Sequence, residues 1–274
     1  MDILLRSLAI TAGVVVALVL LGYVGLQVRP KSFAAYPEHA KVPATVPLPA
    51  DLPAPVERYF KTTVGDRIPV IESAVLTGRG YIRLNGLRFP ARFRFTHEAG
   101  QGYRHYIETT VFGFPLMKVN EWYLDGHARM ELPVGVIEND PKTDMAANLG
   151  LWGESMFLPS IYLTDPRVRW EPIDDNHARL IVPYGEGSDE FTVTFDVGTG
   201  LLESMEAMRW KAPTSPAKTL WRNEVRDWKK VGDLLLPTSF AVVWQDDSGP
   251  WFAGELEDVV YNVDVKEYIR SSGP

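Results

Sequence analysis

Residues 81–95 read YIRLNGLRFPARFRF, and this stretch decides the fold. Apolar and polar side chains alternate on both sides of Asn85 and Gly86, which is the pattern of two half-buried strands. Asn-Gly supplies the two positive φ angles of a type I′ turn, so the strands form a two-residue hairpin. The register of that turn places Ile82 opposite Phe89 on the apolar face.

The same alternation recurs along most of the later chain. Turn signals at 174–176, 198–200, Gly232 and 246–250 separate the later apolar runs. We expect further strands at 103–112, 116–124, 127–137, 166–172, 177–183, 190–196, 201–210, 219–229, 234–245 and 251–263. This spacing predicts a mainly β fold, a curved antiparallel sheet or half-barrel.

Two helices are expected to pack on this sheet. Asp51 can cap the first, which ends at Gly65 and carries its apolar residues on one face: Val56, Tyr59, Phe60 and Val64. The second begins at a Thr143 or Asp144 cap and ends before Pro159. Its apolar stripe consists of Met145, Leu149, Trp152 and Met156. A lone amphipathic helix must bury such a stripe, and the open side of the curved sheet is the available place.

The N-terminal sequence predicts a transmembrane helix. The 22 residues from Ser7 to Val28 carry no formal charge, and Arg6 and Arg29 bracket them. Such a run covers the roughly 30 Å hydrocarbon core and is longer than the apolar region of an ordinary signal peptide. No good cleavage site follows it, so we expect an uncleaved, single-pass signal anchor in a bacterial inner (cytoplasmic) membrane.

Charge and length disagree about the side of the membrane on which the domain lies. Arg29, Lys31 and Lys41 follow the helix and only Arg6 precedes it, so the positive-inside rule would keep the domain in the cytoplasm. Long domains translocate largely regardless of charge, and a very short N-terminal tail is typical of signal anchors. We therefore expect an extracytoplasmic domain, in the periplasm.

These features divide the chain into five segments. They are a short tail at 1–6, the anchor at 7–28, a Pro-rich stalk at 29–50, the antiparallel β domain at 51–265 and a C-terminal tail at 266–274. The density of proline favours extended polyproline geometry, so the stalk should hold the domain some tens of ångströms from the membrane.

Composition excludes several classes of partner and site. The formal net charge is -7 and the sequence pI is about 5.3, which argues against a nucleic-acid partner. The chain has no cysteine, so disulfides, thiolate metal sites and a thiol nucleophile are excluded.

The motifs that resemble catalytic or metal sites each have an ordinary structural explanation. Ser155 lacks the second Gly of a nucleophile elbow, and the S-x-x-K match at 215–218 lies in a Pro-rich loop. His105 and Glu108 are three apart on a strand, so they point to opposite faces. His127 and His177 belong to turns, and the five histidines of the chain show no recognisable metal spacing. We therefore expect no catalytic residue, no metal site and no cofactor.

Tryptophan is the most unusual feature of the composition, with eight in the chain. A domain of this size rarely needs so many indoles unless it encloses a roomy apolar interior, although ordinary core packing explains many of them equally well. The predicted hydrophobic cavity is lined by Trp122, Trp152, Met156, Phe157, Trp210, Trp221 and Trp244. Trp152, Met156 and Phe157 are its expected lid residues.

Arginine marks the polar face of the first hairpin. Arg88, Arg92 and Arg94 could receive an acidic head group there. Charged residues that alternate with apolar ones are also what any half-exposed sheet displays, so a solvated face is the alternative.

Several short stretches resemble known families. They are LPAPVERYF at 52–60, NEWYLDGHARM at 120–130, WGESMFLP at 152–159, Pro237 with Trp244, and residues 249–251. Together they are similar to an uncharacterised bacterial family known only as a domain of unknown function. The entry of the strand after Gly232 through Leu236 and Pro237 is more distantly similar to the LolA and LppX envelope carriers. That second resemblance implies a curved antiparallel sheet with helices over an apolar, lipid-holding cavity.

Three functions follow as hypotheses. The first is a membrane-tethered domain that binds a lipid or other hydrophobic ligand between sheet and helix, which requires a cavity of several hundred cubic ångströms. The second is an envelope structural or protein-interaction module, which an exposed apolar patch would favour. The third is a hydrolase, which would need two carboxylates converging in a cleft with opposed pKa shifts.

Overall fold

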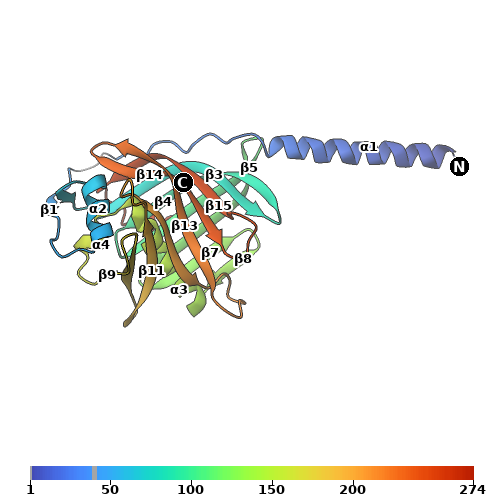
Figure 1. The fold of residues 1–274 in the computed structure, drawn as a ribbon. Helices are drawn as coiled ribbons and strands as arrows, with labels where there is room; N and C mark the ends of the chain where they lie inside the picture. Colours follow the sequence, from blue (N-terminus) through green and yellow to red (C-terminus); the bar gives the residue numbers. More distant parts are fainter. Residues whose placement is uncertain (1, 39–41) are drawn as a thin grey trace.

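A single curved sheet of 13 antiparallel strands forms most of the molecule. The computed structural model describes residues 2–38 and 42–274. Strands follow one another in the order β8-β7-β6-β5-β4-β3-β15-β14-β13-β12-β11-β10-β9, so the C-terminal strand β15 joins the two halves of the meander. Figure 1 shows the sheet curled around its own interior. The prediction of a mainly β, curved antiparallel sheet is confirmed.

The first half of the sheet contains six strands, and the second contains seven. The first six are β3 (Ser73–Leu84), β4 (Leu87–Glu98), β5 (Gly102–Val111), β6 (Phe114–Leu124), β7 (His127–Leu132) and β8 (Gly135–Glu138). The others are β9 (Arg169–Pro172), β10 (His177–Tyr184), β11 (Gly187–Phe195), β12 (Leu202–Arg209), β13 (Thr219–Val231), β14 (Leu234–Trp244) and β15 (Phe252–Tyr261). The single strand expected at 127–137 is two strands, because a turn at 133–134 interrupts it.

The first hairpin has the predicted turn and register. Asn85 and Gly86 adopt φ of 50° and 82°, and Ile82 lies opposite Phe89. The inner face of β4 carries the fully buried Ala91 and Phe93. Residue parity in this hairpin therefore decides which side of the whole sheet is apolar.

Glycine makes room for aromatic rings on that inner face. A Cβ on Gly78 would lie 2.2 Å from the carbonyl oxygen of Glu255 and 2.4 Å from the Phe93 ring. Phe93 in turn packs edge-on against Phe240 and Phe252, with ring centroids 6.0 and 5.7 Å away. The rings can lie across the central strands because no side chain stands at Gly78.

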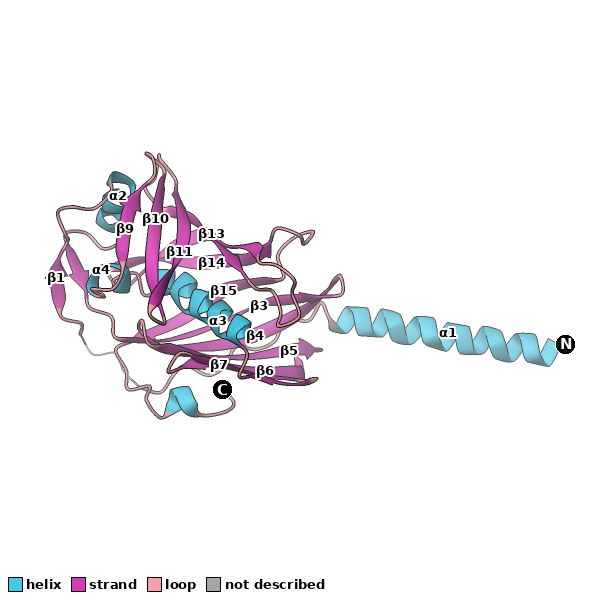
Figure 2. Ribbon diagram, turned by 90° about the horizontal axis from the view of Figure 1, so that it is seen from below, coloured by secondary structure: helices cyan, strands magenta, loops and turns pink. Residues whose placement is uncertain are grey.

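One long helix fills the curve of the sheet. Helix α3 (Pro141–Glu154) lies inside the sheet in Figure 2, and a short 3₁₀ turn, η1 (Ser155–Phe157), continues it. Ten of its 14 residues are buried, so the helix is enclosed on most sides and has no single apolar stripe. Its N-cap is Asp140, whose carboxylate accepts from the Thr143 backbone at 2.7 Å. The prediction that Thr143 or Asp144 caps this helix was wrong, because the helix begins earlier, at Pro141.

Smaller elements close one end of the sheet. They are α2 (Ala54–Thr63), α4 (Ile161–Thr164) and the two-stranded sheet of β1 (Thr45–Pro47) and β2 (Arg67–Pro69). The C-terminal turn η2 (Tyr268–Arg270) lies instead on the outer face beside β5, where the Tyr268 carbonyl accepts from Arg104 at 2.8 Å. Helix α2 buries Val56, Tyr59 and Phe60 as expected. It begins after Pro53 without a side-chain cap, so the assignment of Asp51 as its cap was wrong.

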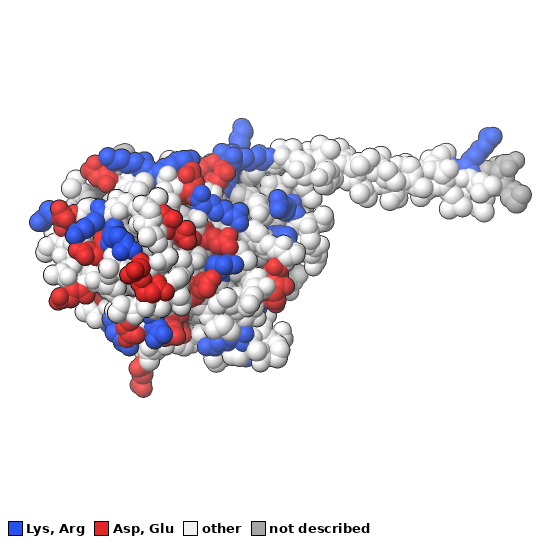
Figure 3. All heavy atoms as spheres, viewed as in Figure 1, with Lys and Arg blue, Asp and Glu red and all other residues white. Residues whose placement is uncertain are grey.

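Helix α1 (Asp2–Gly25) projects from the domain (Figure 1). Its segment Leu4–Gly25 is long and apolar enough to cross a membrane by length and composition. Figure 3 shows no charge along it except near its N-terminal end, whereas charges of both signs are mixed over the visible face of the domain.

The segment after α1 lies against the outer face of the sheet. Three arginines donate to its backbone carbonyls: Arg79 to Pro30 at 2.9 Å, Arg92 to Lys31 at 3.2 Å, and Arg94 to Ala34. Phe33 packs against Tyr106 with ring centroids 5.6 Å apart. Residues 29–36, which we call the strap, therefore differ from the free-standing stalk expected there. The rest of that predicted stalk includes residues 39–41, which lie outside the described residues.

Candidate ligand cavity

A cavity of about 550 Å³ separates helix α3 from the inner face of the sheet. Its apolar wall includes Phe95 and Ile107 from the first half of the sheet, Val242 and Phe252 from the central strands, and Phe157 from η1. Strands far apart in the chain contribute because the meander curls back over α3. The size and the apolar, aromatic lining are those of a small-molecule or lipid site.

Close approach of α3 to the sheet bounds this space on one side. A Cβ on Gly153 would lie 2.6 Å from Nδ2 of Asn223 and 2.9 Å from the Trp221 ring. Asn148, one turn earlier, donates to the Pro183 carbonyl at 3.1 Å and to Asp189 at 3.0 Å, and accepts from the Tyr123 hydroxyl at 3.3 Å. The helix is thus held to strands of both halves of the sheet.

Tryptophan and arginine share another part of the wall. The Arg209 guanidinium lies 4.5 Å from the Trp221 ring centre and 5.5 Å from that of Trp244. Its Nε donates to the Ala146 carbonyl of α3 at 2.8 Å. No carboxylate of the described residues forms an ion pair with Arg209, and burial lowers its pKa. The cavity therefore has an aromatic, cationic wall that can receive the polar end of an amphiphile.

Acidic and histidine side chains form the polar floor of the cavity. Nε2 of His105 lies 2.7 Å from Oε2 of Glu154, and its Nδ1 lies 3.8 Å from Oε2 of Glu121. The Tyr103 hydroxyl donates to Glu121, and the Tyr103 ring stacks on His105 at 4.1 Å. His97 is 1% exposed, and its Nε2 lies 3.2 Å from Oε2 of Glu154.

Charge interactions dominate the protonation of this floor. Burial opposes a charge on His105, but Glu154 and Glu121 outweigh it and raise the pKa of His105 to about 9. Burial likewise opposes ionisation of Glu154, yet His105 and then His97 lower its pKa to about 2. The pKa of Glu121 is also lowered, against burial, by His105 and Tyr103. The two carboxylates shift in the same direction, and so lack the opposed pKa values that a hydrolase pair needs.

Most of the tryptophans proposed for the cavity lie in its wall. Trp210, Trp221, Trp244, Met156 and Phe157 line it, and so does Trp251, which was not proposed. Trp152 is fully buried in the main core, where its carbonyl accepts from the Tyr162 hydroxyl at 2.6 Å. Trp122 lies opposite Arg104 on the outer face of the sheet, away from the cavity, because its strand parity differs from that of Glu121.

The arginines of the first hairpin lie on that outer face. Arg92 and Arg94 contact the strap, and Arg92 also pairs with Glu108 at 2.6 Å. Arg88 forms no ion pair with a described residue, and its guanidinium lies 4.8 Å from the Tyr81 ring centre. Arg92 and Arg94 thus bind the protein's own chain, whereas Arg88 stays available.

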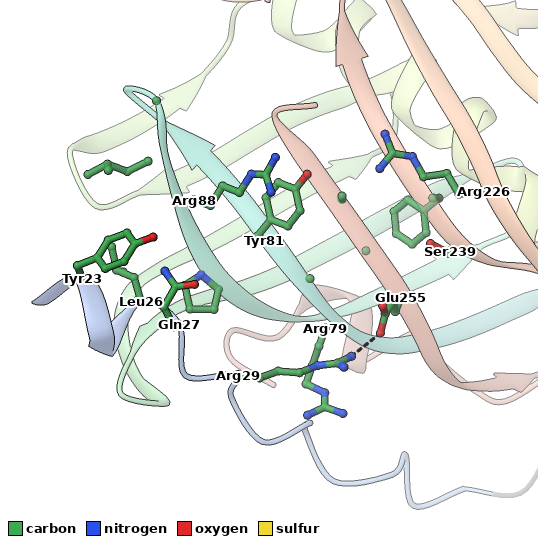
Figure 4. Close-up of a pocket in the computed structure, with 17 residues that line it drawn as sticks. Tyr23, Leu26, Gln27, Arg29, Arg79, Tyr81, Arg88, Arg226, Ser239 and Glu255 are labelled. Carbon is green, nitrogen blue, oxygen red and sulfur yellow. Dashed lines mark hydrogen bonds and ion pairs between the residues drawn. The ribbon is translucent and has the colours of Figure 1, made fainter. Parts of the chain in front are cut away.

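A second hollow of about 620 Å³ lies where α1 meets the outer face. Figure 4 shows Tyr23 of α1 and Leu26, just after the helix, on one side and Arg88 and Arg226 on strands opposite, with Arg29 paired to Glu255 at 2.5 Å. We call it the anchor groove. It contrasts with the cavity in having fewer aromatic side chains in its lining.

Sequence reasoning missed the polar floor. His97 and His105 share the parity of the apolar residues Phe95 and Ile107, so strand alternation alone could have placed both on the inner face. The opposite faces of His105 and Glu108 are confirmed, since Glu108 pairs with Arg92 outside. Glu154 could not be found this way, because its position depends on where α3 crosses the sheet.

Several solved structures are similar to this chain. A LolA superfamily protein from Nitrosomonas europaea is 9% identical, with a TM-score of 0.48 and coverage of 79% of this chain and 96% of that one. A DUF1329 family protein from Desulfovibrio piger is 13% identical, with a TM-score of 0.42 and coverage of 71% and 87%. A putative outer membrane lipoprotein-sorting protein domain from Vibrio parahaemolyticus is 10% identical, with a TM-score of 0.40 and coverage of 78% and 92%. At these scores the likenesses carry no conclusion about function.

Family membership is settled by the sequence itself. Among curated proteins, none matches this chain. A family model matches residues 43–256, which span nearly the whole β domain. The expected resemblance to a domain of unknown function is confirmed, and the chain belongs to the family of unknown function DUF6544.

Proposed function

We propose that the domain binds a lipid or another hydrophobic molecule in the cavity between α3 and the sheet. The observation that carries this proposal is a space of about 550 Å³ with an aromatic and aliphatic lining. Removing an acyl chain from water contributes about 0.8 kcal/mol per buried CH₂, so an apolar space of this size can bind one tightly. The polar floor and Arg209 offer partners for a polar end.

Tryptophan fluorescence gives a direct test with the full chain in lipid nanodiscs. Trp210, Trp221, Trp244 and Trp251 line the cavity, and α1 contains no tryptophan. A brominated fatty acid should therefore quench these indoles saturably when it enters the cavity, whereas quencher dissolved around α1 meets no tryptophan.

A space-filling variant and a matched control make the test specific. Ala146→Phe adds a ring to the α3 wall of the cavity and should weaken saturable quenching at least tenfold. Val134→Phe adds the same ring where the side chain is 93% exposed, and should bind as the unmodified chain does. Equal quenching of both variants, with unchanged circular dichroism, would contradict the proposal.

We further propose that α1 anchors the chain in the bacterial inner membrane with the domain on the extracytoplasmic side. Large apolar side chains are exposed on the β5–β6 hairpin, where Phe114 and Leu116 are 73% and 51% exposed. The hairpin is next to α1, since the Phe112 backbone donates to the Gly25 carbonyl at 2.8 Å. An apolar edge beside the end of an anchor fits contact with the bilayer interface. Protease accessibility in cells tests this orientation. Digestion of the domain by added protease once the outer membrane is permeabilised, while the inner membrane stays intact, would support it.

The anchor groove suggests a second ligand, an anionic lipid head group. Arg88, which has no ion-pair partner among the described residues, faces a space next to Tyr23 and Leu26. In nanodiscs with phosphatidylglycerol, native mass spectrometry should retain more lipid on the chain than with phosphatidylcholine. Arg88→Gln should remove the difference, and Arg169→Gln, at a 62% exposed side chain, should not. Equal retention of both lipids would exclude this site.

A further inference from the structure

Three donor groups converge at the polar floor of the cavity. His97 lies on β4, His105 on the neighbouring strand β5, and Glu154 at the end of α3, and one ligand atom of each lies within 4.8 Å of the other two. Two donors held about 2.0–2.1 Å from a tetrahedral zinc ion are about 3.3 Å apart. The separations from Oε2 of Glu154, 2.7 Å to Nε2 of His105 and 3.2 Å to Nε2 of His97, are both shorter than that value, so the donors need to move apart by only a few tenths of an ångström to hold an ion.

His97 is the side chain that an internal ion pair does not explain. A pair between His105 and Glu154 would be complete by itself. His97 is 1% exposed, yet neither of its ring nitrogens has a hydrogen-bond partner among the described residues, since its approach to Glu154 is poorly aligned. A buried, unsatisfied imidazole costs about 1–3 kcal/mol. A cation bound between the three groups would remove that cost.

The surroundings of His105 are those of a metal ligand. Its ring lies between the rings of Phe95 and Tyr103, both at a centroid distance of 4.1 Å, which fixes its orientation. Glu121 lies behind its Nδ1, and Tyr103 donates to Glu121 in turn. A carboxylate that accepts from a ligating imidazole holds the tautomer that leaves the other nitrogen free for the metal, and Glu121 would take this role by closing the 3.8 Å separation from Nδ1.

We propose that His97, His105 and Glu154 bind a divalent transition-metal ion, with zinc as the first candidate. Imidazole and carboxylate donors suit this class of ion and exclude neither iron nor nickel. His105 and Glu154 line the cavity, so a remaining coordination position faces it. This arrangement, three protein donors and one open position, distinguishes the site from a closed structural one. The ion would lie where it can coordinate a polar group of a cavity ligand.

Metal stoichiometry of the full chain, purified without a histidine tag and stripped with chelator, tests the site. After incubation with Zn²⁺ and removal of excess metal, mass spectrometry should find one zinc ion per chain. Co²⁺ should give visible d–d absorption bands of a low-coordinate site. Neither result depends on ligand binding, so the metal site and the cavity can fail separately.

Variants locate the ion. His97→Asn and Glu154→Gln should each abolish stoichiometric zinc and the cobalt spectrum, and Glu121→Gln should weaken affinity about 10–100-fold. His177→Asn removes a 36% exposed side chain that pairs with Asp174 in a turn, and should keep both signals. Zinc should raise the melting temperature of the unmodified chain and not that of His97→Asn. Absence of stoichiometric binding by the folded, unmodified chain, or full retention in His97→Asn and Glu154→Gln, would overturn the proposal.

Discussion

At the scale of single residues, polar groups inside the sheet are placed to connect its parts. Asn148 is the clearest case, because its one amide contacts Tyr123 of β6, the Pro183 carbonyl of β10 and Asp189 of β11. Such a residue satisfies donors and acceptors that would otherwise be buried without partners. The ionised form of its neighbour Asp189 is destabilised there. Burial raises the pKa of the Asp189 carboxyl, although Asn148 and Lys218 act in the opposite direction.

The raised pKa of Asp189 predicts a pH-dependent gain from Asp189→Asn. Asp189 binds its proton more tightly in the folded state than in the unfolded state. Its ionisation therefore lowers the free energy of unfolding at pH values above the folded-state pKa. Below the unfolded-state pKa the group is protonated in both states and has no such effect. The variant should therefore be more stable than the unmodified chain at pH 7, and this difference should disappear near pH 3. Urea unfolding at both pH values measures it. Glu190→Gln, at a 67% exposed side chain, should change stability by less than about 0.5 kcal/mol.

At the scale of elements, α3 determines whether a cavity exists. It starts at a well-defined cap: the Asp140 carboxylate accepts from the backbone and the hydroxyl of Thr143, at 2.7 and 2.8 Å. Asp140→Ala removes both bonds and should lower the unfolding free energy by about 1 kcal/mol, whereas Asp140→Asn keeps an acceptor and should cost less. Equal losses in thermal unfolding of the two variants would mean that charge, and not capping, matters at this position.

The central strands make a second prediction at this scale. Gly78→Ala would place a methyl group against the Glu255 backbone and the Phe93 ring, so strands β3 and β15 must separate locally. We expect a loss of about 1–3 kcal/mol in denaturant unfolding. Gly187→Ala is the control, because the nearest atom to its added Cβ would be 3.7 Å away. If Gly78→Ala is as stable as the control, strands β3 and β15 can separate to admit the methyl group without loss of stability, and the prediction is wrong.

Element-level reasoning from sequence succeeds where a single periodicity decides the outcome. Alternation around Asn85 and Gly86 predicts the hairpin, its register and its apolar face, because strand geometry leaves no other choice. The same parity could have placed His97 and His105 together. It could not show that α3 is enclosed on most sides, because burial of a helix depends on how far the sheet curls. Nor could it distinguish Trp152, in the core, from Trp221, in the cavity wall.

At the scale of the whole molecule, the strap determines how the domain sits relative to α1. A polyproline spacer would leave the domain free to move some tens of ångströms from the end of the helix. The strap instead crosses the outer face, where Arg29 pairs with Glu255 and Arg79 hydrogen bonds to Glu257 at 2.7 Å and to the Pro30 carbonyl. Sequence alone could not show this, since arginines on an outer strand face usually contact solvent, and their partners here are backbone carbonyls distant in the chain.

Phe33 and Tyr36 are the aromatic side chains by which the strap packs on the domain, and removal of Phe33 leads to the last prediction. The ring packs on Tyr106 and lies beneath the Arg92 guanidinium, 4.5 Å from its centre. Phe33→Ala should expose the arginine contacts of the strap to water, where each adds little to the binding of the strap. Residues 29–36 should then detach from the outer face of the sheet. Hydrogen exchange of that segment should then accelerate strongly while exchange in β3 to β5 stays slow. Val42→Ala, at a 95% exposed side chain, should change neither rate. If exchange in the strap is already fast in the unmodified chain, or is unaltered by Phe33→Ala, the domain is held near α1 by something other than these contacts.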